Sequence, residues 1–524
     1  MTTPETVAAP RGATNSSARH ALPSMAPEDA HNRALVEQVH PANWVNPEPA
    51  PSYNLVVIGG GTAGLVSAAG AAGLGAKVAL VERHFLGGDC LNVGCVPSKG
   101  LISAARRAAD VRDAGAFGVR VPEGVTVDFA AVMERMRRLR AEIAPNDGAT
   151  RFRELGVDVF LGSGEFVGPD RVEVGEHTLR FKKAVIATGA RASAPPIPGL
   201  DTIDYLTNET LFSLTELPAR MVVIGAGPIG CEMAQSFARF GCRVTLLEMG
   251  EHVLPREDRA AALLVQEALA HDGVDLRTMT ATKSVEQRGA EKLVHVEHAG
   301  VEESLAADAV LVAVGRAPNV KLGLEAAGVR YDERKGVMVD DQLRTTNPNI
   351  FAAGDIASRY QFTHSADFLA RIVIQNALFP GPKAKASALN VPWCTYTDPE
   401  VAHVGLDAAE AKTQGLEVEA FTVPMADVDR AILEGETAGY VEILTERGKD
   451  RIVGATIVAR HAGEMIGELS VAMKGGVGLG TVANTMHPYP TQAEAIRRAG
   501  DLYNRTRVTP FVANLLKRWM AFTR

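Results

Sequence analysis

The apolar residues that follow position 50 come in short runs whose character changes at glycines. Leu55–Ile58 is apolar and partly β-branched, Ala63–Gly73 is rich in small residues without charge, and Lys77–Val81 is mostly apolar again. This order predicts a buried strand, a helix and a second buried strand, which together begin a parallel sheet.

The same unit occurs a second time, 166 residues further along the chain. Its strand, helix and strand are expected at Met221–Ile224, Pro228–Phe240 and Arg243–Leu247. A repeated βαβ unit predicts an α/β protein with two Rossmann-like dinucleotide-binding domains. At roughly 150 residues per domain, a chain of 524 residues has room for at least one domain more.

One part of the pattern has the length of a membrane span. Positions 55 to 76 carry no charge over 22 residues, which is long enough to cross a bilayer. The stretch contains seven glycines, three of them consecutive, so we interpret it as strand, tight turn and helix. The chain begins Met-Thr-Thr-Pro-Glu, without a basic or an apolar leader region. We therefore expect no signal peptide, a cytoplasmic location and no membrane partner.

The first 50 residues differ from the rest. Eight of the 28 prolines lie within the first 51 residues, and positions 1 to 30 show neither a helical nor a strand period, which predicts disorder there. Apolar residues then return, and we expect them to pack an arm against the body. They are Leu35, Val36, Val39, Trp44 and Val45.

Composition and charge narrow the possible partners. Hydrophobic residues make up 46% and charged residues 22% of the chain, as in ordinary soluble globular proteins. The net charge of −8, without a strongly basic half, argues against nucleic acid. A helical stretch from Phe129 to Leu155 carries a cluster of four arginines near its start, but no aromatic residues are interleaved with these charges, so we interpret it as a solvated helix face. The four are Arg135, Arg137, Arg138 and Arg140.

Each βαβ unit carries a glycine motif at its strand–helix turn. The motif glycines are Gly59, Gly61 and Gly64 in the first unit and Gly225, Gly227 and Gly230 in the second. Glycines permit the tight turn and let the helix N-terminus bind a pyrophosphate. Glu82 and Glu248 each follow the last glycine by 18 residues, where a carboxylate accepts hydrogen bonds from a ribose. Two such sites predict two dinucleotides, and hence hydride transfer between a nicotinamide and a flavin.

The acid of the second motif also bears on the choice of nicotinamide nucleotide. The charge of Glu248 would repel a 2′-phosphate, which favours NADH over NADPH. Arg243, Arg256 and Arg259 are close enough in sequence to leave NADPH possible.

Two cysteines, Cys90 and Cys95, lie just after Glu82. The five cysteines of the chain are few and odd in number, which is unlike a disulfide framework and suits redox-active thiols. Residues five apart on a regular helix lie about 140° apart around its axis, so a bond between the two sulfurs requires an irregular turn, which Gly94 permits. A helix is expected at positions 104 to 111, and a cysteine at its N-terminus would have a stabilised thiolate.

The thirteen residues Gly87–Lys99 resemble the active-site motif of the pyridine nucleotide–disulfide oxidoreductases, flavoproteins that include mercuric reductase, dihydrolipoamide dehydrogenase and glutathione reductase. The resemblance covers almost everything after residue 50, and it implies FAD and a nicotinamide nucleotide as cofactors. Further positions that resemble the cofactor-binding segments of the family are Gly164, Ala187, Thr188, Gly189, Gly315, Gly354, Asp355 and His364.

The resemblance also implies how the domains are arranged. Both dinucleotide-binding domains would be followed by a C-terminal α+β dimerisation domain, whose start resembles Thr397–Glu400. The expected boundaries are an N-terminal extension at 1–50, an FAD-binding domain at 51–200 and 321–388, an NAD(P)-binding domain at 201–320, the dimerisation domain at 389–505 and a helical tail at 506–524.

Catalytic roles follow from the same resemblance. Cys95 would be the thiolate next to the flavin, and Cys90 the thiol that exchanges with substrate. Lys99 would lie beside the flavin and pair with Glu232, since either charge alone would be costly to bury. In a homodimer, Tyr489 and Glu494 would complete the site of the other subunit.

At one position the chain departs from the disulfide reductases of this family. These enzymes carry a histidine five residues before the glutamate, but here that position is Tyr489. A phenol, with a pKa near about 10, is a poorer base at neutral pH than an imidazole near about 6.5, which weakens lipoamide and glutathione chemistry. His487 lies two residues away, and we expect it to have a packing or surface role. A tyrosine here is similar to mercuric reductase, whose soft metal substrate prefers sulfur ligands.

Mercuric reductase in turn has features that this sequence lacks. No cysteine follows Cys394, no Cys-x-x-Cys segment precedes the first glycine motif, and Pro228 stands where mercuric reductase has a tyrosine. We therefore expect a mercuric-reductase-like enzyme without a resident metal, whose electron acceptor is a small molecule such as a quinone, a disulfide, a soft metal ion or oxygen. Dihydrolipoamide dehydrogenase and a non-enzymatic flavin-binding redox sensor are the alternative hypotheses.

Overall fold

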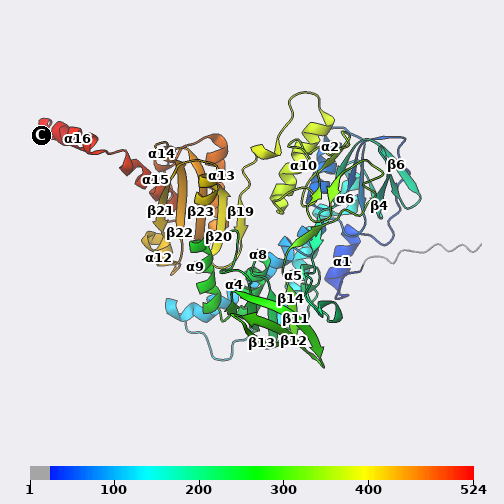
Figure 1. Ribbon diagram of the computed structural model, residues 1–524, viewed down its shortest axis with the longest axis horizontal. Coiled ribbons are helices and arrows are strands. Elements are labelled where there is room, and N and C mark those ends of the chain that lie inside the picture. Colours follow the sequence, from blue (N-terminus) through cyan, green and yellow to red (C-terminus); the bar gives the residue numbers. More distant parts are fainter. Residues whose placement is uncertain (1–23) are drawn as a thin grey trace, which may run out of the picture.

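The computed structural model describes residues 24–524, which form three lobes (Figure 1). The disorder predicted for positions 1 to 30 therefore lies mostly outside the described residues. An arm, residues 24–46, precedes the first lobe, and a tail that contains the last helix follows the third.

The first lobe is built on a seven-stranded sheet with the order β3-β2-β1-β6-β5-β4, in which β18 also pairs with β6. Its strands are β1 (Tyr53–Ile58), β2 (Val78–Glu82), β3 (Val157–Leu161), β4 (Gly164–Gly168), β5 (Arg171–Val174), β6 (His177–Ile186) and β18 (Ile350–Ala352). The central strands run parallel, so their carboxyl ends lie at one edge, where nucleotides bind in folds of this kind.

Helices cover this sheet and extend from it. They are α1 (Ala30–Val39), α2 (Thr62–Gly73), α3 (Gly88–Asn92), α4 (Cys95–Asp113), α5 (Phe129–Ile143), α6 (Ala149–Glu154) and α10 (Thr363–Leu378). Helices α2 and α10 pack against each other, while α4 passes on to contact helix α8 (Pro228–Arg239) of the second lobe. The segment that carries both cysteines thus lies between two lobes.

The second lobe contains a four-stranded parallel sheet with the order β10-β9-β8-β14. Its strands are β8 (Arg220–Ile224), β9 (Arg243–Leu247), β10 (Asp275–Arg277) and β14 (Ala309–Val312). An antiparallel sheet of β11 (Thr280–Arg288), β12 (Glu291–His298) and β13 (Val301–Ala307) lies beside it, and α9 (Arg259–His271) completes the lobe.

The third lobe is a five-stranded antiparallel sheet with helices, as expected for an α+β domain. The strand order is β19-β20-β23-β22-β21. The strands are β19 (Trp393–Thr395), β20 (Glu400–Gly405), β21 (Val418–Pro424), β22 (Tyr440–Glu446) and β23 (Ile452–Ala459). Its helices are α11 (Ala408–Thr413), α12 (Asp429–Leu433), α13 (Ala462–Gly475), α14 (Leu479–Ala483) and α15 (Glu494–Thr506), and α16 (Pro510–Phe522) forms the tail.

Short elements connect these lobes. They are β7 (Ala190–Ala192) paired with β15 (Arg316–Pro318), β16 (Tyr331–Asp332) paired with β17 (Gly336–Val337), α7 (Asn208–Leu211), and the 3-10 turns Ala114–Phe117, Ala144–Asp147, Leu200–Thr202, Ala386–Ala388 and Met425–Asp427. Within the described residues, no helix is long and apolar enough to cross a membrane.

The α/β fold and both βαβ units are confirmed, with element ends that differ by at most two residues from those predicted. The long helix predicted from Phe129 to Leu155 is wrong in its middle. It is broken into α5 and α6 by a 3-10 turn that begins at Ala144 and contains Pro145, because proline cannot donate the backbone hydrogen bond that a helix interior needs.

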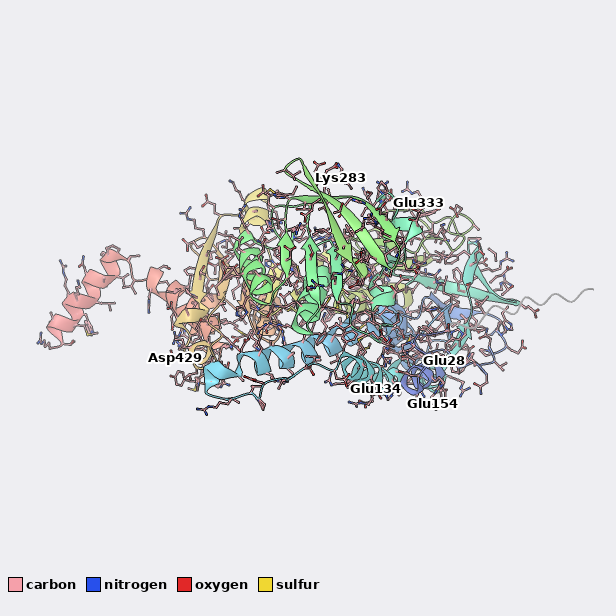
Figure 2. All side chains as sticks on the ribbon, turned by 90° about the horizontal axis from the view of Figure 1, so that it is seen from below. Glu28, Glu134, Glu154, Lys283, Glu333 and Asp429 are labelled. Atoms are coloured by element: carbon pink, nitrogen blue, oxygen red, sulfur yellow. The ribbon has the colours of Figure 1, made fainter. Side chains whose placement is uncertain are left out.

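The prediction that the arginines of this stretch form a solvated face is wrong for Arg137 and Arg140, which are buried. Helix α1 of the N-terminal arm packs on α5 and covers them. Figure 2 shows how close the arm comes, with Glu28 near the labelled Glu134 and Glu154. The predicted docking of the arm is confirmed for Leu35 and Val39, which are fully buried, but Val45 is 85% exposed.

Candidate active site

A single cavity of about 2230 Å³ joins the first two lobes and reaches the third. It is lined by most of the cofactor and catalytic residues that the sequence singled out. These are Gly59, Gly61, Glu82, Cys90, Cys95, Lys99, Gly164, Ala187, Thr188, Gly189, Gly225, Gly227, Glu232, Glu248, Gly315, Gly354, Asp355 and His364. The structure therefore brings both glycine motifs and both cysteines to one continuous space.

The first glycine motif needs glycine at both ends. Gly59 has φ +108°, a conformation that side chains disfavour, and a Cβ there would overlap the carbonyl of Ala187 on the neighbouring chain segment. A Cβ on Gly64 would overlap the carbonyl oxygen of Gly59, so this glycine serves the close packing of α2 on the turn rather than the cavity wall. Gly61 caps α2, whose N-terminus faces the cavity.

Glu82 holds this turn from the end of β2. One carboxylate oxygen accepts a hydrogen bond from the Gly60 N–H at 2.6 Å and the other from the His84 N–H at 2.6 Å. Burial raises the pKa of Glu82, while these two donors oppose the shift. Because each carboxylate oxygen has a second lone pair, Glu82 keeps acceptor capacity toward a ribose.

The second glycine motif repeats this arrangement 166 positions later. Gly225 has φ +99°, and a Cβ on Gly230 would overlap the Gly225 carbonyl. Glu248 accepts hydrogen bonds from the Ala226 N–H at 3.0 Å and the Gly250 N–H at 2.8 Å. Its helix, α8, begins with Pro228, whose fixed φ suits the first helical position.

Both halves of the cavity fit a dinucleotide. Each offers a glycine turn that would clash with any side chain, the N-terminus of a 12-residue helix, and an acid at the end of the following strand. Gly164 lies close to this first site, where a Cβ would be 2.9 Å from Val81. Of the arginines considered for a 2′-phosphate, Arg256 lines the cavity, whereas Arg243 and Arg259 do not.

The cysteine pair lies on two helices separated by a sharp turn. Cys90 is in α3, and Cys95 is the first residue of the 19-residue helix α4. Gly94 forms the irregular turn between them, with φ −136° and ψ −115°, and a Cβ there would lie 2.7 Å from the Asp89 carbonyl oxygen. The predicted break at Gly94 is confirmed, and α4 begins nine residues earlier than the helix expected from the sequence.

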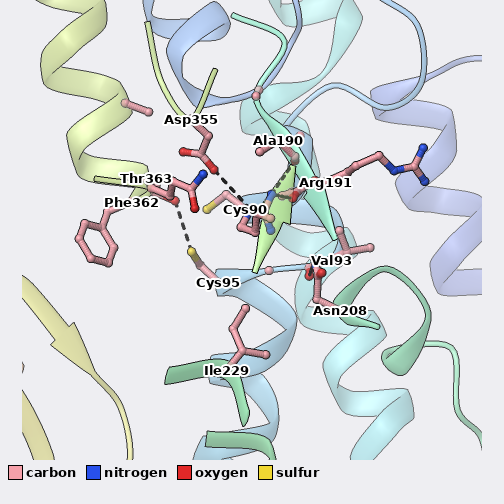
Figure 3. Close-up of a pocket in the computed structure, with 18 of the residues that line it drawn as sticks. Cys90, Val93, Cys95, Ala190, Arg191, Asn208, Ile229, Asp355, Phe362 and Thr363 are labelled. Carbon is pink, nitrogen blue, oxygen red and sulfur yellow. Dashed lines mark hydrogen bonds and ion pairs between the residues drawn. The ribbon is translucent and has the colours of Figure 1, made fainter. Parts of the chain in front are cut away.

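The two thiols differ strongly in acidity. A hydrogen bond from the Cys90 thiol, with smaller contributions from Thr363 and the charge of Lys99, lowers the pKa of Cys95 to about 6, although burial opposes the shift. The Cys95 sulfur lies 3.3 Å from the Thr363 hydroxyl at the start of α10, as Figure 3 shows. The same thiol–thiol hydrogen bond and burial raise the pKa of Cys90. The reduced pair therefore holds its charge on Cys95 and its proton on Cys90.

Lys99 lies one turn beyond Cys95 and forms the expected ion pair. Its ammonium is 2.9 Å from a Glu232 carboxylate oxygen and 4.4 Å from the centre of the Tyr396 ring. Glu232 is buried, and its other oxygen accepts the Tyr396 N–H at 2.9 Å. Helix α4, helix α8 and the third lobe are thereby joined at one buried carboxylate.

A second charged group faces the thiols from β15 and the loop after β18. Burial raises the pKa of Asp355 to about 6, which the Arg316 guanidinium 3.6 Å away opposes. Arg316 also contacts Asp89, the residue before Cys90. Gly354 has φ +84°, so the turn that presents Asp355 favours glycine. His364 forms no hydrogen bond with a charged group of residues 24–524. Its Nε2 lies 2.6 Å from the Pro392 carbonyl oxygen.

Two predicted catalytic residues lie away from this cavity. Tyr489 is 69% exposed on the third lobe, and its hydroxyl donates to Asp429 at 2.8 Å. This hydrogen bond raises the pKa of Tyr489. Glu494 is buried at the start of α15, where Arg497 and Arg498 contact it. His487 packs against Glu468 at 2.9 Å, which agrees with the packing role expected for it.

The sequence did not reveal a group of hydrogen-bonded residues that supports the cysteine segment. Arg140, 2% exposed, donates to the Asn92 carbonyl oxygen at 2.5 Å and to the Asn32 side-chain oxygen at 2.6 Å. Asn92 lies between the two cysteines, and Asn32 belongs to the N-terminal arm. Beside it, Arg137 binds Asp29 at 2.5 Å. The arginines in a helical spacing were the available signal, but Asp29 and Asn32, the partners of Arg137 and Arg140 in the arm, lie 108 positions away in the sequence.

Comparison with known proteins identifies the family. A sequence profile described as "Pyridine nucleotide-disulphide oxidoreductase" matches residues 53–368, and that of its dimerisation domain matches residues 391–500. The chain is 36% identical to a mercuric reductase of Bacillus cereus over 87% of its own length and 72% of the relative's. It is 37% identical to a dihydrolipoyl dehydrogenase of Bacillus subtilis (strain 168) over 85% of its own length and 95% of the relative's.

A solved structure agrees with these matches. The HOCl-induced flavoprotein disulfide reductase RclA from Escherichia coli superimposes with a TM-score of 0.77 and 30% identity, covering 86% of this chain and all of that one. With the two nucleotide sites and the paired thiols in one cavity, the chain belongs to the pyridine nucleotide-disulphide oxidoreductases, the FAD-dependent enzymes that take electrons from NAD(P)H.

Proposed function

We propose that this enzyme is a homodimer that uses NADH to reduce its Cys90–Cys95 disulfide and passes the electron pair to a soft metal ion of the mercuric type. The observation that carries the proposal is the acidity of the two thiols combined with the residue at position 489. Cys95 is held as a thiolate, whereas Tyr489 has a pKa above the ordinary value of a phenol. Soft metal ions bind thiolates and need no base to exchange protons with a leaving thiol.

The two glycine motifs and their acids have distinct proposed roles in binding the two nucleotides. Gly59, Gly61 and Glu82 would hold FAD along α2, and Gly225, Gly227 and Glu248 would hold the nicotinamide nucleotide along α8. When bound, FAD accepts a hydride equivalent from the nicotinamide and supplies two electrons to the disulfide. Gly164, Ala187, Thr188, Gly189, Gly315, Gly354, Asp355 and His364 complete the wall of this space.

The thiols then take the electrons. Two electrons and one proton convert the disulfide into the Cys95 thiolate and the Cys90 thiol, because the low pKa of Cys95 leaves it charged at neutral pH. Lys99 stabilises this negative charge, and Glu232 keeps the ammonium in position at 2.9 Å. Cys90 and Asp355 line the same cavity (Figure 3), where the Cys90 thiol can attack or ligate an acceptor that enters.

Dimerisation is part of the proposal because two of the predicted catalytic residues, Tyr489 and Glu494, lie away from the cavity of their own subunit. One carboxylate oxygen of Glu494 is buried without a hydrogen-bond partner among residues 24–524, and Tyr489 points outward from the third lobe. Both lie in the region that matches the family's dimerisation domain. A second subunit would bring them to the thiols across the interface.

The test is anaerobic reduction of the purified FAD enzyme by NADH, followed by addition of Hg²⁺, lipoamide, glutathione disulfide or a quinone in separate samples. Reoxidation of the flavin by Hg²⁺ alone supports the proposal. Rapid reoxidation by lipoamide, with NAD-linked oxidation of dihydrolipoamide, would assign the enzyme to the dihydrolipoyl dehydrogenases instead.

Two variants show whether the disulfide is used. Cys90→Ser and Cys95→Ser should each keep FAD and each lose Hg²⁺-dependent turnover, since either change removes the disulfide. Cys242→Ser is the matched control, because Cys242 is buried in the second lobe outside the cavity. Unchanged turnover in both active-site variants would remove the disulfide from the mechanism.

A further inference from the structure

The C-terminal helix α16 (Pro510–Phe522) buries none of its thirteen residues against the part of the chain that the structure describes. Figures 1 and 2, which view the molecule from directions at right angles, both show it standing clear of the third lobe. It also lies beyond residue 500, where the match to the family's dimerisation domain ends.

The helix forms from local signals. Thr509 caps it by accepting the Val512 N–H at 3.3 Å, and Pro510 occupies its first position. An isolated helix of 13 residues is marginal in water, so a surface that receives one of its faces would stabilise it.

One face of α16 is strongly apolar. At about 100° per residue, its large apolar side chains fall within one half of the helix circumference. They are Phe511, Val512, Leu515, Leu516, Trp519, Met520 and Phe522. Phe511 is 76% exposed, Trp519 59% and Phe522 85%. An exposed apolar face of this width indicates a binding surface.

The charges on and around this helix all have one sign. From residue 502 to the end of the chain there is no Asp or Glu, although the whole chain has a net charge of −8. The basic residues of this segment are Arg505, Arg507, Lys517, Arg518 and Arg524. On the helical wheel, Lys517 lies opposite the apolar face, and Arg518 lies at its edge, about 20° from Phe511. A wide apolar face with Trp and Phe, with basic residues outside it and at its edge, is typical of helices that lie in the interface of an anionic membrane.

We propose that α16 is an interfacial anchor that binds this enzyme to the surface of an anionic lipid bilayer. The helix is about 20 Å long and a bilayer core about 30 Å thick, so α16 lies in the surface and does not span it. Phe511, Trp519 and Phe522 enter the boundary between headgroups and acyl chains, and the basic residues face the anionic headgroups. The expectation of no membrane partner rested on the lack of a spanning segment, and this contact departs from it. It is independent of the acceptor proposed above.

The observations favour lipid over a second copy of the chain as the occupant of this face. A protein interface buries an apolar face without requiring that every nearby charge be positive, whereas an anionic bilayer attracts each of the five basic residues. The acid-free segment extends from Leu502, before the helix begins, which matches a flat charged surface better than a local pocket.

The test is co-sedimentation of the FAD-loaded enzyme with vesicles of phosphatidylglycerol and phosphatidylcholine in equal parts, compared with pure phosphatidylcholine. We expect at least tenfold tighter binding to the anionic vesicles and a marked loss of binding in high salt. Trp519→Asp should weaken binding at least tenfold. Val301→Asp, at a valine of β13 that is 69% exposed, is the matched control and should change nothing.

Two results would overturn the proposal. One is equal binding of both vesicle types, or binding that Trp519→Asp leaves unchanged. The other is found by light scattering on a variant that ends at Val508. If its mass in solution falls to that of a smaller oligomer, the apolar face belongs to a second copy of the chain. An unchanged mass together with lost vesicle binding supports the anchor.

Discussion

The two glycine turns of this enzyme are nearly identical in backbone and differ in surroundings. In both, an acid 22 positions after the second motif residue accepts the N–H of that residue, and a final glycine lets the helix pack on the turn. Yet Glu82 is buried, the cysteine segment follows it closely in sequence, and the N-terminal arm contacts the residues just after it, whereas Glu248 is partly exposed. We therefore infer that the motif specifies how a dinucleotide is held, and that the surroundings specify whether it stays or exchanges.

The largest expected effect comes from adding a methyl group to the last glycine of each motif. Gly64→Ala and Gly230→Ala both place a Cβ against a carbonyl oxygen, and overpacking costs on the order of 1–3 kcal/mol or more. We expect Gly64→Ala to be purified without FAD and with a lower thermal midpoint. Gly230→Ala should keep FAD and lose saturation by NADH. Visible absorbance and NADH titration distinguish them, and equal FAD loss in both would contradict the difference between the two sites.

A smaller effect is expected from removing Arg140, whose hydrogen bonds support the first unit alone. Arg140→Met leaves the Asn92 carbonyl and the Asn32 side chain without their buried donor, at a cost of about 2–3 kcal/mol in the free energy of unfolding. Urea unfolding measures this loss, and the KM for NADH should not change. Arg138→Met, at an exposed arginine of the same helix, is the control. A similar loss of stability in the control would show that Arg140 has no special role.

The low pKa of Cys95, in the first unit, predicts that the reactivity of this thiol depends on pH. After reduction, alkylation of Cys95 should fall about tenfold for each pH unit below about 6, because only the thiolate reacts. Thr363→Val removes one hydrogen bond to the sulfur and should move the midpoint upward. Since the pKa is below the ordinary value of 9, the thiolate's contribution to stability is complete above pH 9 and is lost as the pH falls to about 6. A midpoint near 9 in the unaltered enzyme would contradict this.

The smallest effect concerns the second unit alone. Glu248→Gln keeps an oxygen for the Ala226 or Gly250 N–H but removes the charge that repels a 2′-phosphate. The preference for NADH over NADPH, measured as the ratio of kcat/KM values, should fall about tenfold, or about 1.4 kcal/mol. Glu251→Gln, an exposed neighbour, is the control. No change in the ratio would mean that the preference is set elsewhere, for example at Arg256.

Much of the fold could be predicted from the sequence because its signals are local. The strands and helices around both motifs, the break at Gly94 and the Lys99–Glu232 pair follow from short segments or from the family resemblance. The burial of Arg137 and Arg140 could not be predicted, because it depends on Asp29 and Asn32 in a different part of the chain. The contact of Thr363 with Cys95, which are 268 positions apart, has the same cause. In the proposed homodimer, the surroundings of Tyr489 would depend on the second subunit, which the sequence of a single chain does not place.

The arm that precedes the first strand has a practical consequence for protein production. An expression clone trimmed to start at Tyr53, where the match to the family begins, would omit Asp29 and Asn32. Arg137 and Arg140 would then lose these partners and the cover of α1, and Arg140 is the residue that donates to the backbone between the redox cysteines. Such a trimmed enzyme should be harder to purify with its flavin than the full-length chain.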